Sequence, residues 1–365
     1  MSDRYDLGIL IKTMMEQGAS DMHLSVGAPP AYRVNGQIVR AKTRPLTGED
    51  TKNICYALMT EAQRKKFEVD HELDFAFGYK GLARIRANVF VQRNSIAAVF
   101  RRLESEIRPL ESLGFNRQIQ GLTDRPHGLV LVTGATGSGK STTLASFLER
   151  INATKRAHIV TIEDPIEYTF NHKLSLVNQR EVGADCKSFA TALRQVLRED
   201  PDVIMVGEMR DRETAESALR AAETGHLVFS TLHTNGAIQT ITRVVQLFPP
   251  ESQDYVRSLL SFSLEAVVSQ ALIERGDRPG RVLAYEYLQM TPAIRHLVRE
   301  NKLHQVYSQM QMGQESHGMS TMNQMLLQYA QQGVISLTEA LNHSPDPEEL
   351  GRMIERAQNG GRRAG

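Results

Sequence analysis

The stretch TGATGSGKSTT, residues 133–143, decides the fold of this chain. Its glycines, lysine and serine fit the pattern G-x-x-x-x-G-K-[ST], in which backbone N–H groups turn towards phosphate oxygens. Lys140 then reaches the β and γ phosphates, and the Ser141 hydroxyl binds Mg²⁺. An apolar run precedes the stretch and a helical pattern follows it, so the positive end of a helix faces the same anion. The predicted nucleotide-binding residues are Gly134, Ala135, Thr136, Gly137, Ser138, Gly139, Lys140, Ser141 and Thr142.

Short apolar runs around this loop predict a parallel sheet. They are GLVLVT (128–133), HIVTIE (158–163), DVIMVG (202–207) and LVFSTL (227–232). Helical patterns separate most of them, and strands that alternate with helices form a parallel sheet covered on both faces. The fold class is therefore α/β, a P-loop core whose sheet is mostly parallel.

The chain is expected to contain two domains and a helical C-terminal region. Residues 1–103 mix helix and strand patterns, as in a small α+β domain, and the charged residues 104–111 form a linker. The nucleotide-binding core spans 112–280, and 281–365 is helical with a disordered tail. The most apolar helix candidate, residues 256–273, contains two charged residues and is not a membrane span.

Composition narrows the class of protein further. The 365 residues include 43 Lys and Arg against 42 Asp and Glu, which argues against a strongly basic nucleic-acid binder. Cys55 and Cys186 are the only cysteines, so a disulfide framework is not expected and a reducing compartment is favoured. The N-terminus lacks the pattern of a signal peptide. These features predict a soluble cytoplasmic protein.

Two sets of carboxylates follow apolar runs and are expected to hold a metal and orient water. Glu208 ends the run DVIMVGE, whereas Asp202 starts it and should lie at the far end of that strand. Glu163 and Asp164 end another run. Ligands of an open parallel sheet bind at the carboxyl ends of its strands, so both sets should converge on the phosphates. The structural alternative is that Glu163 and Asp164 only cap a turn before Pro165.

His233 follows the run 227–232, whose strand should lie beside the one that ends near Glu208. This is the place of a γ-phosphate sensor in P-loop motors. A purely structural histidine is the alternative. A metal site is not indicated at His233, because the sequence suggests no third ligand nearby.

Four ordered segments resemble the Walker A, Asp box, Walker B and His box of the secretion-ATPase superfamily. They are GATGSGKSTT (134–143), IEDPIEY (162–168), LRQVLREDPDVIMVGEMRD (193–211) and ETGHLVFSTLHTN (223–235). Residues 18–36 resemble its N-terminal domain. Within the superfamily the chain resembles the PilT-type retraction ATPases of type IV pili, because AIRHLVRE (293–300) is similar to their AIRNLIRE motif, and 318–336 to their C-terminal region. Three residues depart from the family pattern: Ala135 replaces a frequent proline, and His296 and Val298 replace Asn and Ile.

The resemblance implies a PAS-like N-terminal domain joined to a RecA-like ATPase core. The active form would be a homohexameric ring with ATP and Mg²⁺ at each subunit interface. Glu163 would polarise the attacking water, and Glu208 would support Mg²⁺ together with Ser141, partly through water. Three arginines match the finger positions of the family, with a solvated strand face or a salt bridge as the alternative. They are Arg86, Arg101 and Arg243.

The resemblance also implies a motor that powers pilus retraction, which is pilin disassembly, and twitching motility. Its partners would be its own copies and the inner-membrane platform protein of the pilus, with no nucleic acid. A second retraction ATPase is a further candidate partner, and the sequence does not specify whether one is needed. It would work in the cytoplasm at the inner face of the bacterial inner membrane, and reach the membrane only through partners.

Several alternatives stay open at this point. A PilU-type accessory retraction ATPase is the nearest one. Pilus-assembly and type II secretion ATPases normally carry a four-cysteine zinc motif, which two cysteines cannot make. The balanced charge argues against a DNA-transfer ATPase. The presence of both Glu163 and Glu208 argues against a scaffold that hydrolyses little ATP. The sequence specifies neither the direction of rotation nor the symmetry of the ring.

Overall fold

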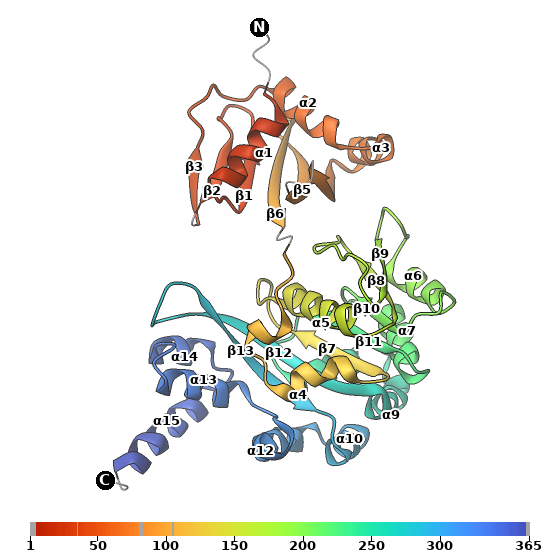
Figure 1. Cartoon of the computed structure of the whole chain (residues 1–365), viewed down its shortest axis with the longest axis vertical. Coiled ribbons are helices and arrows are strands. Elements are labelled where there is room, and N and C mark those ends of the chain that lie inside the picture. The colour runs from red at the N-terminus through yellow and green to blue at the C-terminus, as the bar shows by residue number, and fades with distance from the viewer. Residues whose placement is uncertain (1–4, 35, 80–82, 104–105, 363–365) are drawn as a thin grey trace. The chain divides into compact units, whose positions relative to one another are not determined.

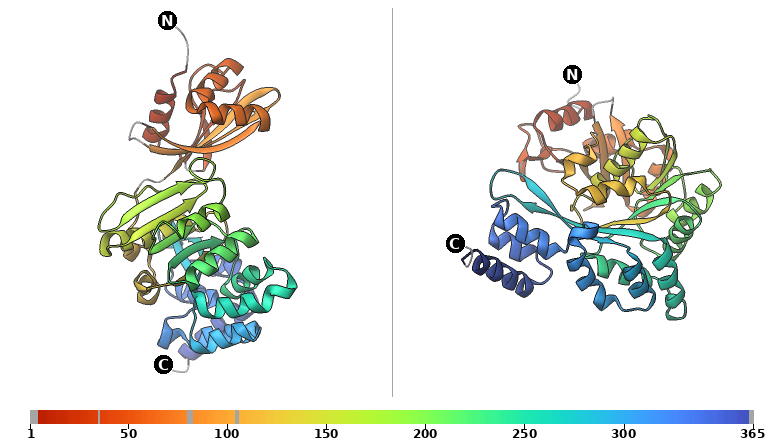
Figure 2. Two further views of the ribbon diagram at one scale, coloured as in Figure 1. Left: turned by 90° about the vertical axis from the view of Figure 1, so that its right-hand side faces the viewer. Right: turned by 60° about the horizontal axis from the view of Figure 1, so that its bottom comes forward.

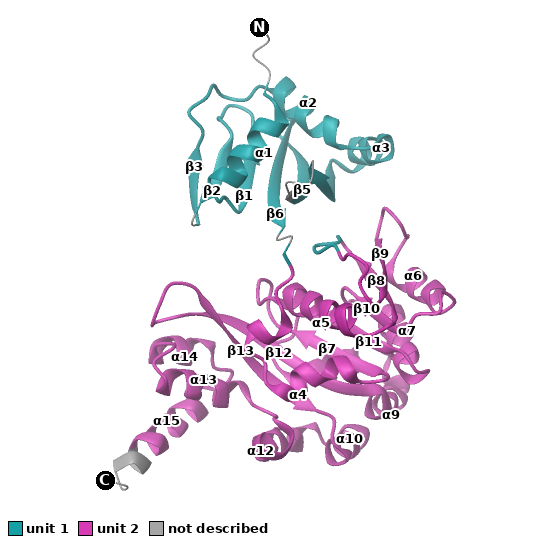
Figure 3. Ribbon diagram, viewed as in Figure 1, with its two compact units in different colours: residues 1–106, 165–169 teal, residues 107–164, 170–365 magenta. Residues whose placement is uncertain are grey.

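The computed structural model describes residues 5–34, 36–79, 83–103 and 106–362. The chain divides into two compact units, shown in Figure 3. Unit 1 comprises residues 1–106 and 165–169, and unit 2 comprises 107–164 and 170–365. Part of the predicted linker, residues 104 and 105, and the last three residues of the predicted disordered tail lie outside the described residues.

Unit 1 is a six-stranded antiparallel sheet in the order β3-β2-β1-β6-β5-β4. The strands are β1 (Asp21–Leu24), β2 (Ala31–Val34), β3 (Gln37–Arg40), β4 (Glu72–Tyr79), β5 (Ala83–Gln92) and β6 (Ser95–Leu103), and the helices are α1 (Leu7–Glu16), α2 (Gly48–Leu58) and α3 (Glu61–Asp70). Alternation along β5 buries Ile85, Ala87 and Val89. Arg86 therefore lies on the opposite face, where it pairs in register with Arg101 of β6.

Unit 2 contains a seven-stranded sheet in the order β13-β12-β7-β11-β10-β8-β9. Its strands are β7 (Gly128–Thr133), β8 (His158–Glu163), β9 (Leu176–Glu181), β10 (Val203–Val206), β11 (Leu227–Leu232), β12 (Leu264–Glu274) and β13 (Arg281–Gln289). Neighbouring strands are parallel except for the antiparallel pair β12–β13. Strands β7, β10 and β11 are buried along their whole length, as strands covered on both faces must be. The α/β class is confirmed.

Helices cover both faces of this sheet, and Figures 1 and 2 show them in three views. One hydrophobic core packs the sheet against α6 (Phe189–Val196), α7 (Arg212–Glu223), α8 (Ala237–Gln246), α9 (Gln253–Ser263), α10 (Pro292–Arg299) and α11 (Val306–Met312). The other core packs it against η1 (Leu110–Leu113), α4 (Arg117–Gln120), α5 (Lys140–Thr154), α13 (Met322–Gln331), α14 (Leu337–His343) and α15 (Pro347–Arg362). The remaining short turns are η2 (Gly121–Asp124), η3 (Pro250–Ser252), η4 (Leu303–Gln305) and α12 (Gln314–His317).

Two segments differ from the sequence expectation. The interpretation of residues 256–273 as one helix is wrong, because α9 ends at Ser263 and β12 begins at Leu264. Strand β12 lies between β7 and β13 in the sheet. A buried strand lacks the alternation of polar and apolar residues, so its sequence cannot be told apart from that of a buried helix. Strand β13 also falls in a region expected to be helical. Among the described residues, no helix is both long enough and apolar enough to cross a membrane.

Candidate nucleotide site

The loop 134–139 joins β7 to α5 and depends on glycine. Gly134, Gly137 and Gly139 have φ angles of 140°, 80° and 91°, which favour residues without a side chain. A Cβ atom on Gly134 would lie only 2.3 Å from the carbonyl oxygen of Gln270. Glycine therefore lets the loop pack directly against β12. Ala135, Thr136 and Gly137 form the exposed tip of the loop.

Lys140 begins α5 and folds back over the loop. Its Nζ donates to the carbonyl oxygens of Gly134, at 2.9 Å, and of Ala135, at 3.0 Å. The hydroxyl of Ser138 is buried within the loop and has no hydrogen-bond partner in the part of the chain that the structure describes. A cation and an uncommitted buried hydroxyl thus border the place where the motif holds phosphate, which fits a nucleotide.

The predicted carboxylates lie at the carboxyl ends of parallel strands. Glu163 is the last residue of β8, and Glu208 follows β10 by two residues. Val206 pairs in register with Ile162, so the two strands end side by side. Glu163 is only 8% exposed. Its Oε1 accepts hydrogen bonds from Thr161 Oγ1 at 2.7 Å and from Gln179 Nε2 at 3.0 Å, which hold the carboxylate in one orientation.

His233 connects the loop to the second carboxylate. It follows β11, which pairs with β10 as the sequence predicted. Its Nδ1 lies 3.4 Å from Lys140 Nζ, and its Nε2 lies 3.4 Å from Glu208 Oε1. The neutral imidazole with its proton on Nε2 satisfies both contacts, since Nδ1 then accepts from the ammonium and Nε2 donates to the carboxylate. The fold therefore brings together three of the predicted site residues.

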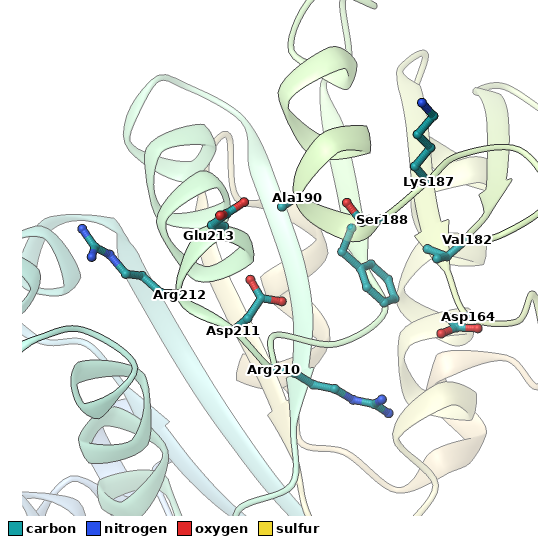
Figure 4. A pocket seen from close by; sticks show the side chains of 10 residues that line it. Asp164, Val182, Lys187, Ser188, Ala190, Arg210, Asp211, Arg212 and Glu213 are labelled. Atoms are coloured by element: carbon teal, nitrogen blue, oxygen red, sulfur yellow. The ribbon is translucent and has the colours of Figure 1, made fainter.

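The other oxygen of Glu208 pairs with Arg210 NH2 at 2.8 Å. Arg210 and Asp164 also line a cavity of about 600 Å³, shown in Figure 4. The remaining residues around this cavity are Val182, Lys187, Ser188, Phe189, Ala190, Asp211, Arg212 and Glu213. Ser188 and Asp211 cap α6 and α7, so the starts of two helices border the cavity. The cavity thus opens beside the loops that follow β8 and β10.

Gln270 is a site residue that sequence reasoning missed. It lies in β12 and is 2% exposed. Its Nε2 donates to the Ser138 carbonyl oxygen at 2.7 Å, and its Oε1 accepts from Thr143 Oγ1 at 3.0 Å. The side chain therefore fixes both ends of the turn from loop to helix. A polar amide within an otherwise apolar run could have indicated a buried side chain that needs hydrogen-bond partners. This inference was not made, because the segment was interpreted as a helix.

The predicted finger arginines have partners of their own. Arg86 forms a bidentate ion pair with Asp74, at 2.8 and 3.2 Å, and Arg101 Nε lies 2.8 Å from Asp21 Oδ1. All four residues belong to unit 1. Arg243 lies on α8 in unit 2 with an exposed side chain. The finger role of these three arginines stays a prediction.

The helix α10 carries the AIR motif, and its apolar residues lie in the core. Ile294, Leu297 and Val298 are buried against the sheet and neighbouring helices. Arg295 NH1 donates to the carbonyl oxygens of Ser261, Phe262 and Leu264, at 2.9 to 3.0 Å. This motif therefore packs α10 and closes the end of α9. His296 and Val298, the two departures, cause no visible disruption of the helix.

A magnesium ion at this site would use few protein ligands. Ser141 lies exposed in the first turn of α5, and Glu208 is partly buried after β10. Within the described ranges, no group of three or more His, Cys, Asp or Glu side chains is arranged to hold a metal ion. A hydroxyl and one carboxylate fit a cation that takes its other ligands from phosphate and water.

Comparison with known proteins finds relatives over almost the whole chain. Residues 6–342 match the family model of the type II/IV secretion system protein. The type IV pilus retractation ATPase PilT of Pseudomonas aeruginosa is 50% identical over 345 residues, which are 94% of this chain and 100% of that protein. The type IV pilus ATPase PilU of the same species is 40% identical over 346 residues, covering 95% of this chain and 90% of that one.

A solved structure is similar over the same extent. The crystal structure of the pilus retraction motor PilT with bound ADP has a TM-score of 0.90 and 56% sequence identity, and covers 96% of this chain and 100% of that one. These similarities extend through both units and include every strand of the nucleotide site. The chain belongs to the type II/IV secretion system protein family.

Proposed function

We propose that this chain is the ATP-hydrolysing motor of type IV pilus retraction, and so of twitching motility. The observation that carries the proposal is the meeting of Lys140, His233 and Glu208 at one edge of the sheet. It occurs in a chain that resembles a retraction ATPase over 94% of its length. ATP supplies the energy, and its hydrolysis drives the extraction of pilin from the fibre.

The site residues have distinct roles in this proposal. The loop 134–142 wraps the phosphates, and the Lys140 ammonium leaves its carbonyl partners to neutralise the β and γ oxygens. Ser141 and Glu208 would hold Mg²⁺, partly through water, and the ion would neutralise charge that develops on the phosphates.

Glu163 accepts a proton from the attacking water as the water oxygen bonds to the γ phosphorus. The bond to the β–γ bridging oxygen breaks, and ADP leaves. Thr161 and Gln179 keep the Glu163 carboxylate oriented for this step. His233 links Lys140 to Glu208, so it registers whether the γ phosphate is present.

The ring completes each site. Six copies assemble, and Arg86, Arg101 and Arg243 neutralise the transferring phosphate, with at least one of them supplied by a neighbouring copy. Domain 1–103 and core 112–280 change their mutual angle during the cycle. The motor works in the cytoplasm at the inner face of the inner membrane, where it acts on the pilus platform protein, and a second retraction ATPase is a further candidate partner.

Deletion of the gene tests the proposal. Excess surface pili without retraction are expected, because assembly continues and disassembly stops. Wild-type copies should restore retraction, whereas Lys140→Ala copies should not, although that variant should melt at the wild-type temperature. Loss of pili on deletion would instead assign the chain to pilus assembly. Purified wild-type chain that hydrolyses no ATP would overturn the motor assignment.

A further inference from the structure

Glu286 is a buried carboxylate that the mechanism above does not use. It lies in the middle of β13, opposite Ser269 of β12, and is 6% exposed. Burial raises the pKa of this carboxyl group above its ordinary value. Because a buried carboxylate is costly unless donors surround it, its position calls for an explanation in terms of partners.

The partners of Glu286 are the first residues of two helices. Its Oε1 accepts from the Ala237 N–H at 2.6 Å, and its Oε2 accepts from the Met322 N–H at 3.4 Å. Ala237 begins α8 and Met322 begins α13, and both helices contact β13. The first N–H groups of a helix have no partner within the helix, and they attract negative charge.

The two helices depend on this carboxylate to different degrees. Helix α13 has its own capping box, formed by Thr321 and Gln324. Helix α8 begins after Gly236, which has no side chain, and no side chain of the N-cap residue bonds to its N–H groups. The φ angle of 154° at Gly236 favours glycine, and a Cβ atom there would be only in ordinary van der Waals contact with Glu286 Oε1, at 3.6 Å. The Glu286 side chain, which comes from β13, is therefore the cap of α8.

The start of α8 is tied to the nucleotide site. Only three residues separate His233 from Ala237. Thr240 Oγ1 lies 2.7 Å from Thr234 Oγ1, which fixes the first turn of α8 to the residue after His233. The same hydroxyl contacts Thr133 Oγ1 at 3.3 Å, at the end of the strand that enters the phosphate loop. A shift of the first turn would therefore move the His233 ring relative to Lys140 and Glu208.

We propose that Glu286 is a positioning residue for ATP hydrolysis, which caps α8 from β13 and thereby holds His233 in contact with Glu208 and Lys140. Met322 N–H orients the carboxylate through its second oxygen. The inference rests on the proposed ATPase function, and it assigns to Glu286 no contact with ATP.

The test combines two substitutions in one cycle. Glu286→Ala should lower kcat by about tenfold with little change in KM for ATP, because the phosphate loop keeps its own contacts. In a His233→Ala background, the same substitution should change kcat less than twofold, since the residue through which it acts is gone. Glu286→Gln should restore most of kcat, because its amide oxygen still accepts from Ala237. Ser336→Ala is the matched control: it removes the side-chain cap of α14, which does not bond to Glu286, and should lower the melting temperature while sparing kcat.

A second readout does not depend on turnover. Hydrogen exchange at the amides of residues 237–240 should be faster in Glu286→Ala than in the wild type, whereas amides of β10 should keep their protection. An equal loss of kcat with and without His233 would overturn the proposal, and so would unchanged exchange at α8. If wild-type rings hydrolyse no ATP but the exchange result holds, the proposed function fails while the capping role of Glu286 survives. If Glu286→Ala does not fold, the Glu286→Gln variant is the test. The proposal requires this variant to keep wild-type kcat and wild-type protection of the α8 amides, and a loss of either would overturn it.

Discussion

Gln270→Leu should weaken both the fold and the binding of ATP, because Gln270 braces the phosphate loop from β12. The substitution keeps the approximate volume but leaves the Ser138 carbonyl oxygen and the Thr143 hydroxyl without their partner. An unmade buried hydrogen bond costs about 1–3 kcal/mol. The Thr143 hydroxyl can turn to a carbonyl of the preceding helical turn, so a total near 2–4 kcal/mol is expected.

That free energy predicts two measurable changes. A domain of this size loses about 2–4 °C in melting temperature per kcal/mol, so the midpoint should fall by about 5–15 °C. If ~1.4 kcal/mol of the cost falls on the loop conformation that binds phosphate, KM for ATP should rise about tenfold. Differential scanning calorimetry and steady-state ATPase kinetics measure both quantities.

The matched control is Ser269→Ala, one residue earlier on the same strand, where the side chain points to the other face of the sheet. It should leave KM for ATP unchanged, because Gln270 and not Ser269 holds Ser138 and Thr143. Wild-type KM and melting temperature in Gln270→Leu would refute the bracing role. A lowered melting temperature with unchanged KM would show that Gln270 stabilises the fold but does not affect the binding of ATP.

Four other experiments, which use three substitutions, test separate parts of the molecule. Glu163→Gln should bind ATP and hydrolyse it very slowly, because the amide keeps the shape of the side chain and loses the base; ATP retained on purified protein, without ADP, is the expected result, and wild-type turnover would leave Glu163 a structural role. Leu297→Ala should destabilise the fold by about 2–4 kcal/mol, because its side chain lies in the core, and an unchanged melting curve with lost retraction would instead indicate a surface role. Although burial raises the pKa of Asp21, the hydrogen bond from Arg101 lowers it below the ordinary value of 3.8, so the ion pair should stabilise unit 1 above that pH and lose its effect as the pH falls through the lowered pKa. Arg101→Ala should flatten this acid slope in unfolding experiments, and a slope equal to that of the wild type would contradict the assignment. Rings that mix Arg101→Ala with Glu163→Gln subunits should regain activity above either parent if Arg101 acts across the interface, and confirmed mixed rings without recovery would place its action within one subunit.

The phosphate loop and the strands around it could be predicted because their signals are local. The loop pattern fits within eleven residues, and the buried strands are short apolar runs bounded by helical patterns. The placement of Glu163, Glu208 and His233 at or just after the carboxyl ends of neighbouring strands followed from one rule, that parallel strands present their carboxyl ends at the same edge. The roles of Lys140 and the glycines are likewise contained in the motif itself.

Gln270 and Glu286 could not be predicted, because their roles depend on contacts between distant parts of the sequence. Gln270 reaches Ser138 across 132 positions, and Glu286 reaches Ala237 across 49. Gln270 lies in β12 and Glu286 lies in β13, and the sequence analysis had predicted both of these segments to be helical. Once these segments are placed in the sheet, a buried amide and a buried carboxylate each require partners. Gln270 finds them in Ser138 and Thr143 at the phosphate loop, and Glu286 finds them in the first N–H groups of α8 and α13.

The proposed finger role of Arg86 and Arg101 requires that each arginine be released from its ion pair. Arg86 and Arg101 lie directly opposite each other on β5 and β6, where two like charges would repel unless each were neutralised. Asp74 neutralises one and Asp21 the other. A finger arginine must leave the carboxylate with which it is paired before it can bind phosphate. The free-energy cost of this step depends on whether that carboxylate is then hydrated or left buried without a partner. Asp74 is well exposed and can be hydrated when Arg86 leaves. Asp21 is almost fully buried, so the departure of Arg101 would leave a buried negative charge without its partner. Arg33 Nε lies 3.8 Å from the other oxygen of Asp21 and can take over as partner. If Arg101 acts as a finger, the approach of Arg33 would ease its departure from Asp21, and Arg33→Ala should therefore hold Arg101 in its resting pair.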